Sequence, residues 1–442
     1  MITKQKKIQH LYLRAGFGET PSRVNDALAN EIPGLVDELF KRSDLKDDLA
    51  ALKNPVRGKE ASNLKIALLL LRSKKQVKEL NLAWMEKMVN SPAQLREKMT
   101  LFWHNHFATK VPFAYLAQVQ NNTLRHHALG SFRELLHAVA KDPAMLIFLN
   151  NQQNRERSPN ENFARELMEL FTLGEGHYTE QDIKEAARAF TGWQVNKTGK
   201  FEFNSRQHDF GSKTVFGQTG DWNGDDVIDI ILNNPRTAKF ITQKIYAYFV
   251  NDDVNAPRVE ELGQLFFKSD YDISSLLAHI FTSDWFYEEE NTGNKIASPV
   301  ELLVRYRRLF SLELTNDELW LKSQKILGQV LFNPPNVAGW PGGQNWIDSS
   351  SLMFRLNLAP LFFEYERVDP WAGTKADWSG MYGAFSTKSK EELVREVTQA
   401  FIQADTSSKD DLLMRHITGQ DPEAQVKSAV VRTMMLPEFQ LI

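Results

Sequence analysis

Apolar residues recur at helical spacing along most of the 442 residues, in runs that end at clusters of Pro, Gly and Asn. This periodicity predicts amphipathic helices joined by short connections. The expected helices cover residues 61–89, 92–107, 122–140, 161–171, 179–192, 226–232, 235–250, 258–268, 274–281, 299–312, 318–331 and 349–358. No repeat with a period of about 20 to 50 residues is present, so we do not expect a solenoid. The sequence therefore predicts a mainly α fold, a large multi-helix domain.

Residues 193–217 interrupt the helical pattern. Phe201 and Phe203 alternate with polar residues after the turn sequence Lys197-Thr198-Gly199-Lys200, which is typical of a β-hairpin. A short third strand is expected at 214–216. We therefore expect a small β insertion in an otherwise helical protein.

The composition restricts the chemistry. The 53 Lys and Arg residues nearly balance the 56 Asp and Glu residues, so the basic field that a non-specific nucleic-acid binder requires is absent. The chain has no cysteine, which excludes disulfides, thiolate metal sites and a cysteine nucleophile. No apolar run approaches the roughly 18 residues of a membrane span, and we recognise no signal peptide. We expect a soluble protein, cytoplasmic by default.

Two histidines stand near the end of the helix expected at 92–107. His104 and His106 flank Asn105. Side chains two residues apart on a helix point about 200° away from each other, so both imidazoles can bind one metal ion only where the helix ends. Unwinding after Asn105 would permit this, and we treat both histidines as candidate metal ligands. Otherwise one histidine faces a polar site while the other packs in the core.

The helix expected at 161–171 concentrates charged residues. Arg165 stands four residues from both Glu161 and Glu169, which is the usual spacing of solvated salt bridges. Glu166 lies about 60° from the centre of the apolar stripe, so it is the carboxylate most readily drawn inward. In that position it would need a partner or a raised pKa. Arg165 and Glu166 are therefore candidate catalytic residues.

An imidazole, a carboxylate and an ammonium group lie together after the expected hairpin, between His208 and Lys213. A turn there can present His208 and Asp209 to a divalent metal, while Lys213 or Arg165 receives an anionic oxygen. The alternative is an Asp/Gly turn that ties the hairpin to a helix. For all three clusters, a fully hydrogen-bonded buried network is the competing interpretation.

Residues 332–348 form an irregular loop rich in Pro, Gly and Trp, through which no helix can continue. Trp340 and Trp346 stand in this loop and can form an aromatic platform for a substrate such as a sugar ring, or for a protein partner. Alternatively, the two indoles only anchor the loop to the helices.

Distinctive sequence blocks occur from one end of the chain to the other. They are His10-Leu11, Arg14-Ala15-Gly16-Phe17-Gly18, Phe102-Trp103-His104-Asn105-His106-Phe107, Asn160 to Leu170, Thr172-Leu173-Gly174, Ala189 to Trp193, His208 to Lys213, Pro334-Pro335, Gly339-Trp340-Pro341, Trp346 and Leu436-Pro437-Glu438-Phe439. Together these blocks resemble the bacterial family called domain of unknown function 1800. Their order favours a single unit over residues 1–442, rather than the three domains that length alone indicates. The resemblance implies a bacterial origin, a mostly helical fold and a sulfatase-like partner, and it implies no established activity.

Two functions follow from these observations. The first is a metal-assisted hydrolase, in which a divalent metal held by nitrogen and oxygen ligands activates water against a polar carbohydrate or ester substrate. Its metal ligands would be His104, His106, His208 and Asp209, and its catalytic residues Glu166, Arg165 and Lys213. This hypothesis requires the side chains to meet within a few ångström. The second is a non-catalytic scaffold or binding protein that works with the sulfatase-like partner.

Overall fold

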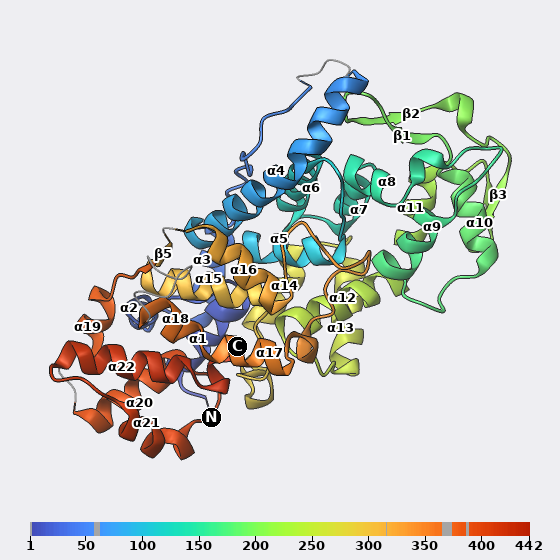
Figure 1. Ribbon diagram of the computed structural model, residues 1–442. Helices are drawn as coiled ribbons and strands as arrows, with labels where there is room; N and C mark the ends of the chain where they lie inside the picture. Colours follow the sequence, from blue (N-terminus) through green and yellow to red (C-terminus); the bar gives the residue numbers. More distant parts are fainter. Residues whose placement is uncertain (1, 57–61, 315, 365–373, 386–388) are drawn as a thin grey trace.

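The structure is a computed structural model that describes residues 2–56, 62–314, 316–364, 374–385 and 389–442. Helices dominate it, and the strands within these ranges form only short antiparallel pairs (Figure 1). The mainly α fold expected from the periodicity is therefore confirmed. No helix in the described ranges is long and apolar enough to cross a membrane.

Helices follow one another along most of the chain, with short strands between some of them. The helices up to residue 189 are α1 (Lys4–Arg14), α2 (Pro21–Ala27), α3 (Ile32–Arg42), α4 (Asn63–Asn90), α5 (Gln94–His106), α6 (Ala114–His127), α7 (Phe132–Ala140), α8 (Pro143–Phe148), α9 (Asn162–Glu166), the π-helix η2 (Leu167–Thr172) and α10 (Glu180–Ala189). The later helices are α11 (Gly224–Leu232), α12 (Pro235–Phe249), α13 (Ala256–Lys268), α14 (Ile273–Thr282), α15 (Pro299–Phe310), α16 (Glu318–Leu327), α17 (Ser349–Leu356), α18 (Leu358–Phe363), α19 (Ser379–Phe385), α20 (Lys390–Phe401), α21 (Asp410–His416) and α22 (Pro422–Met434). The strands are β1 (Trp193–Val195), β2 (Phe201–Phe203), β3 (Lys213–Val215), β4 (Gln218–Gly220), β5 (Glu313–Leu314) and β6 (Thr374–Lys375).

Side-chain caps set many of the helix starts. A capping box opens α10: the Thr179 hydroxyl accepts the backbone N–H of Asp182, and the Asp182 carboxylate accepts the N–H of Thr179. Ser298 and Glu301 make the same reciprocal pair at the start of α15. Each box satisfies backbone donors that the first helical turn leaves without partners.

Two expected helices differ from the structure. Residues 122–140 do not form one helix, because the chain breaks at Gly130 and Ser131 caps a new helix, α7. The helix expected at 161–171 begins as α9 and then widens into the π-helix η2. Periodicity alone does not detect either change, because the apolar spacing continues through both.

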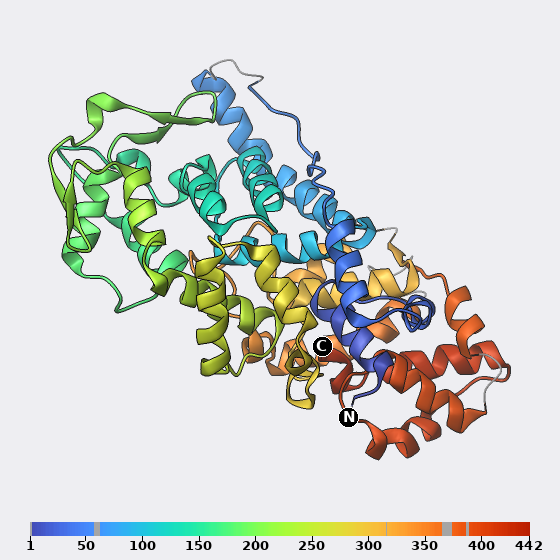
Figure 2. The ribbon, with the colours of Figure 1, turned by 180° about the vertical axis from the view of Figure 1, so that it is seen from behind.

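The expected β insertion is confirmed as two separate hairpins. β1 pairs with β2, with Trp193 opposite Phe203. The expected third strand pairs with its own partner, β4, rather than joining the first hairpin. The insertion therefore extends to Gly220, beyond the expected boundary at 217. Both hairpins lie at one end of an elongated molecule, and α19–α22 lie at the other (Figures 1 and 2).

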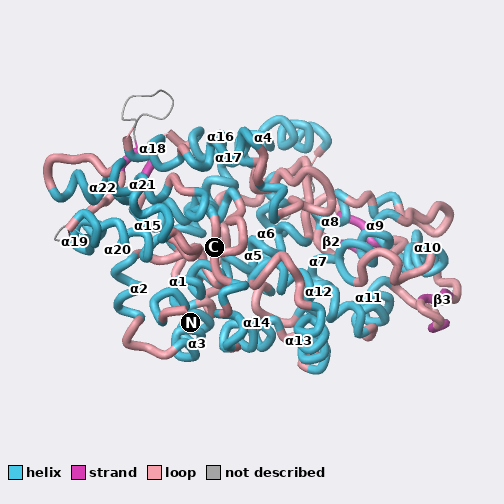
Figure 3. The backbone as a smooth tube through the Cα atoms, turned by 90° about the horizontal axis from the view of Figure 1, so that it is seen from below, coloured by secondary structure: helices cyan, strands magenta, loops and turns pink. Residues whose placement is uncertain are grey.

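Two apolar cores lie along this length. The first core is built mainly from α7 to α14, and the second from α4 and α15 to α22. The helices α1 and α5 contribute to both: Trp103 packs in the first core, whereas Leu101 packs in the second. All residues of α5 except Asn105 are buried. This helix runs through the middle of the molecule, as the view from below shows (Figure 3).

Candidate functional site

The two histidines at the end of α5 turn to different neighbours, as their spacing predicts. His104 accepts a hydrogen bond at Nε2 from the backbone N–H of Phe332 (3.1 Å), and its ring packs edge-on against Trp84. Burial lowers its pKa to about 3, so the imidazole is neutral. His104 therefore holds the start of the 332–348 loop and packs in the interior.

His106 donates from Nε2 to the backbone carbonyl of Phe171 (3.1 Å). That carbonyl lies at the end of η2, where the last turn of a helix leaves acceptors free. Burial, and after it the nearby Lys244, lower the pKa of His106 well below its ordinary value. A neutral imidazole thus connects α5 to the π-helix η2. Short π-helical segments within helices are frequent at functional sites.

Asn105, between the two histidines, fixes the aromatic loop in place. Its side-chain oxygen accepts the backbone N–H of Trp340 (2.7 Å), and its amide donates to the Trp340 carbonyl (3.3 Å). Gly339 has a φ of +78°, and a Cβ there would lie 2.3 Å from the Asn105 Oδ1 atom. Only glycine permits this close approach of loop and helix.

The loop closes one side of a cleft of about 310 Å³, which we call the aromatic cleft. Its walls come from α5, α12, α15 and the 332–348 loop. The lining includes Phe102, His106, Lys244, Tyr248, Asp252, Lys295, Glu301, Trp340 and Trp346. Trp340 and Trp346 are 4% and 7% exposed, so they line a cavity rather than form an exposed platform.

Two ion pairs stand at the polar side of the aromatic cleft. Lys295 pairs with Asp252, and Lys98, buried behind the wall, pairs with Glu301. Burial opposes ionisation of Glu301, but Lys98 and the bonds from Ser298 hold the pKa of this carboxyl below its ordinary value. Burial lowers the pKa of both lysines, in each case against the pull of its carboxylate.

Lys295 stands on a segment that pairs with the last residues of the chain. Ile296 and Leu441 form an isolated antiparallel bridge. On either side of it, the N–H of Ile442 donates to the Lys295 carbonyl (2.8 Å), and the N–H of Ala297 donates to the Gln440 carbonyl (2.9 Å). This pairing fixes the backbone that carries the Lys295 side chain.

Further cations lie within electrostatic reach of these pairs. Burial lowers the pKa of Arg14 to about 9 and that of Arg355 to about 10, while the charge of Glu301 opposes both shifts. Two guanidinium nitrogens of Arg14 and two of Arg355 are buried without a hydrogen-bond partner. Lys244 lines the cleft, and no carboxylate among the described residues pairs with it.

The charge of this region is therefore unbalanced. Within the described part of the chain, Arg14, Lys98, Lys295 and Arg355 all interact with Glu301, and Lys244 lines the same cleft without such a partner. These five cations stand against two carboxylates, Asp252 and Glu301. We call this set the cation cluster. An isolated buried charge costs several kcal/mol, so an excess of buried cations favours a bound anion.

The predicted catalytic residues Arg165 and Glu166 lie on α9, which continues into η2. The expected pair of Arg165 with Glu161 is confirmed (3.2 Å), and Arg165 also binds both carboxylate oxygens of Glu180 at 2.8 Å. Glu169 instead accepts the Tyr178 hydroxyl, because the π-helix changes its direction. Glu166 is half-buried as expected, and burial followed by Glu169 raises its pKa.

The third predicted group ties the hairpins to α10, which is the alternative interpretation of this segment. His208 donates from Nδ1 to the carbonyl of Thr191 (2.9 Å). Asp209 binds Arg188 (2.7 Å), and the Lys213 ammonium donates to the backbone carbonyl of Asp209 (2.6 Å). Each polar group already has a structural partner.

The structure does not bring the three predicted groups together. Among the described residues, no three His, Asp or Glu side chains are placed to hold a metal ion. His106 lines the aromatic cleft, whereas His208 is hydrogen-bonded to the Thr191 carbonyl beside the hairpins. Convergence on one metal thus has no geometric support in the described ranges.

Several cleft residues were not singled out from the sequence. Lys244, Tyr248, Asp252, Lys295 and Glu301 come from two separate stretches of chain, 244–252 and 295–301. Of these five residues, only Glu301 has a recognisable sequence pattern, because Ser298 and Glu301 have the spacing of a capping box. A lysine without a carboxylate partner is recognisable only in three dimensions.

A family model with the description "Protein of unknown function (DUF1800)" matches residues 10–441. The match includes every residue of the aromatic cleft and of the cation cluster. No curated protein and no solved structure matches the chain.

Proposed function

Because the chain belongs to the DUF1800 family, whose description names no activity, we propose its function from the aromatic cleft: the recognition of a small organic anion. The observation that carries this proposal is the excess of buried cations over carboxylates in the cation cluster. An anion in the cleft would offset the desolvation of these groups.

Lys244 is the group best placed to contact the anion. Its ammonium lies 4.9 Å from the centre of the Phe240 ring and pairs with no carboxylate of the described chain. Lys295 is the second candidate contact, although it shares its charge with Asp252. An ammonium with free donors binds a carboxylate, phosphate or sulfate oxygen as a point charge.

The rest of the ligand would be apolar or aromatic. Trp340, Trp346 and Phe102 also line the cleft, and aromatic side chains pack well against flat rings. The volume of about 310 Å³ lies at the lower end of the range for small-molecule sites, so the ligand is small. In this proposal both tryptophans keep the substrate-contact role expected from the sequence.

Isothermal titration calorimetry tests the proposal with benzoate, phenyl phosphate and phenyl sulfate, and with neutral phenyl β-glucoside as the reference. We expect at least one anion to bind and the glucoside to bind more weakly. The variant Lys244→Met should weaken anion binding at least tenfold, or about 1.4 kcal/mol.

Lys239→Met is the matched control, because Lys239 lies on the same helix but pairs with Glu260 at the surface. It should leave the dissociation constant unchanged. The proposal fails if no anion binds, if the glucoside binds equally well, or if Lys244→Met binds the anion as the parent chain does.

The metal-assisted hydrolase and the sulfatase-like partner stay predictions. Metal analysis of the purified protein by mass spectrometry addresses the first. A stoichiometric divalent metal that is lost in a His104→Gln, His106→Gln double variant would support it.

A further inference from the structure

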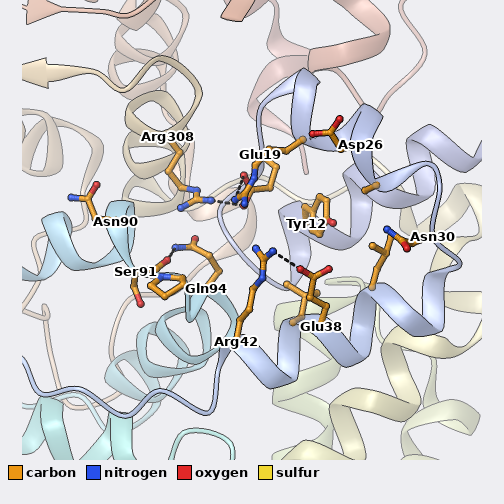
Figure 4. Close-up of a pocket in the computed structure, with 15 residues that line it drawn as sticks. Tyr12, Glu19, Asp26, Asn30, Glu38, Arg42, Asn90, Ser91, Gln94 and Arg308 are labelled. Carbon is orange, nitrogen blue, oxygen red and sulfur yellow. Dashed lines mark hydrogen bonds and ion pairs between the residues drawn. The ribbon is translucent and has the colours of Figure 1, made fainter.

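A second hollow lies apart from the aromatic cleft and shares no lining residue with it. It encloses about 600 Å³ between α1, α2, α3, α15 and the turn from α4 to α5, and we call it the polar pocket. Figure 4 shows Tyr12 near its centre, with Gln94 and Ser91 on one side and Asn30 on the other.

Most charges of the polar pocket are paired within it, and among its described lining residues only the Asp26 carboxylate makes no ion pair. Arg308 binds Glu19 (2.5 Å) and also donates to the carbonyls of Gly18 and Val89. Arg42 binds Glu38, one turn away on the same helix α3 (Figure 4). With Arg23 and Asp26 included, three guanidinium groups face three carboxylates, so the lining has no net charge.

One wall holds an amide with an unused acceptor. Gln94 is 6% exposed, and its Nε2 donates to the carbonyls of Met88 (3.0 Å) and Ser91 (2.6 Å). These two bonds fix which end of the amide is the oxygen. The Oε1 atom is buried and has no donor. This acceptor therefore lies behind the wall, and the part of Gln94 that lines the pocket adds a polar amide to its surface.

Tyr12 supplies both an apolar face and a hydroxyl. Burial, followed by the charges of Glu38 and Glu19, raises the pKa of this phenol, so the hydroxyl stays protonated. It can therefore donate and accept at once. Its ring can also pack against the C–H face of a ligand.

We propose that the polar pocket binds a neutral saccharide. Hydroxyl groups both donate and accept, which suits a lining whose guanidinium and carboxylate groups are equal in number and mostly paired. An ion that bound Glu19 or Glu38 would compete with Arg308 or Arg42, whereas a neutral polyol can bond to the remaining lone pairs of these carboxylates and to Asp26. The volume fits a mono- or disaccharide.

The proposal is tested on the full chain by saturation-transfer difference NMR and calorimetry. The probes are maltose, cellobiose, lactose and N,N′-diacetylchitobiose, with lysine and spermidine as charged competitors. We expect at least one disaccharide to bind, and Tyr12→Ala to weaken its binding at least tenfold. Tyr12→Phe, which keeps the ring, should lose less affinity than Tyr12→Ala.

Two controls separate binding from folding and from the other site. Thermal denaturation identifies any variant that does not fold, and Tyr12→Phe then carries the test. Lys244→Met should bind the disaccharide like the parent chain, because Lys244 lines only the aromatic cleft. The proposal is overturned if no disaccharide binds, if only lysine or spermidine binds, or if both Tyr12 variants retain full affinity.

Discussion

The aromatic cleft and the polar pocket contain similar charged side chains but arrange them differently. In the polar pocket, acids and bases are equal in number and partly exposed. Around the aromatic cleft, cations outnumber carboxylates and most are buried. Pairing and burial, rather than the number of charges, therefore decide which ligand class each hollow suits.

Both sites rest on the same two helices. On α1, Tyr12 lines the polar pocket while Arg14 belongs to the cation cluster. On α5, Gln94 lines the pocket at the first residue and His106 lines the cleft at the last. The aromatic cleft and the polar pocket are therefore two faces of one scaffold.

Removing the buried carboxylate of Glu301 should give the largest change in the free energy of unfolding. Glu301→Gln keeps the capping geometry but leaves Lys98 buried without a negative partner. We expect the free energy of unfolding to fall by about 3 to 5 kcal/mol, because a broken buried pair leaves an uncompensated charge. Urea denaturation of the variant and the parent chain measures this difference in the free energy of unfolding.

The control is Glu288→Gln, which removes one partner of the half-exposed pair with Arg258. That variant should unfold close to the parent chain. Equal stability of the Glu301 and Glu288 variants would contradict the expectation that the buried Lys98–Glu301 pair matters more than the half-exposed Arg258–Glu288 pair.

Acid should give the next largest loss of stability, and it should act through the buried imidazole of His104. The folded pKa of His104 is about 3, whereas an unfolded histidine titrates near 6.5, so only the unfolded chain gains the proton between these values. The stabilisation is complete above pH 6.5 and is lost as the pH falls toward 3. At pH 5 the loss from His104 is about 2 kcal/mol.

Urea denaturation at pH 7, 6 and 5 measures this slope. His104→Gln, which can still accept a hydrogen bond, should show a shallower slope than the parent chain. An identical slope in both proteins would mean that the buried imidazole does not titrate in this way.

The smallest effect is expected in the polar pocket. Arg42→Met removes a pair whose side chains are 42% and 46% exposed. Such pairs contribute about 0.2 to 1 kcal/mol, so the free energy of unfolding should change by no more than that. A loss comparable to that of Glu301→Gln would show that ion pairs hold the pocket together, and the contrast between the two hollows would then fail.

The sequence was informative where structure depends on neighbours along the chain. Helical spacing identified the fold class, and the alternation of Phe201 and Phe203 identified a hairpin. The divergence of His104 and His106 also followed from helix geometry. All of these depend on contacts within a few residues.

The sequence was uninformative where partners lie far apart. Lys98 and Glu301 are separated by about two hundred residues, and nothing near either one marks the pair. The π-helix η2 keeps the apolar spacing of an ordinary helix, so its effect on Glu169 was not predictable. The cation cluster is likewise a property of packing.

Residues 295–297, which carry part of the wall of the aromatic cleft, pair with residues 440–442. This wall therefore depends on residues that are synthesised about 145 positions later in the chain. Contacts of such high sequence separation form slowly, because loop closure costs entropy before the contact is gained. A chain that stops short of Gln440 would leave the Lys295 backbone unpaired. Removal of residues 440–442 would therefore disturb the aromatic cleft at a distance, without removing any side chain that lines it.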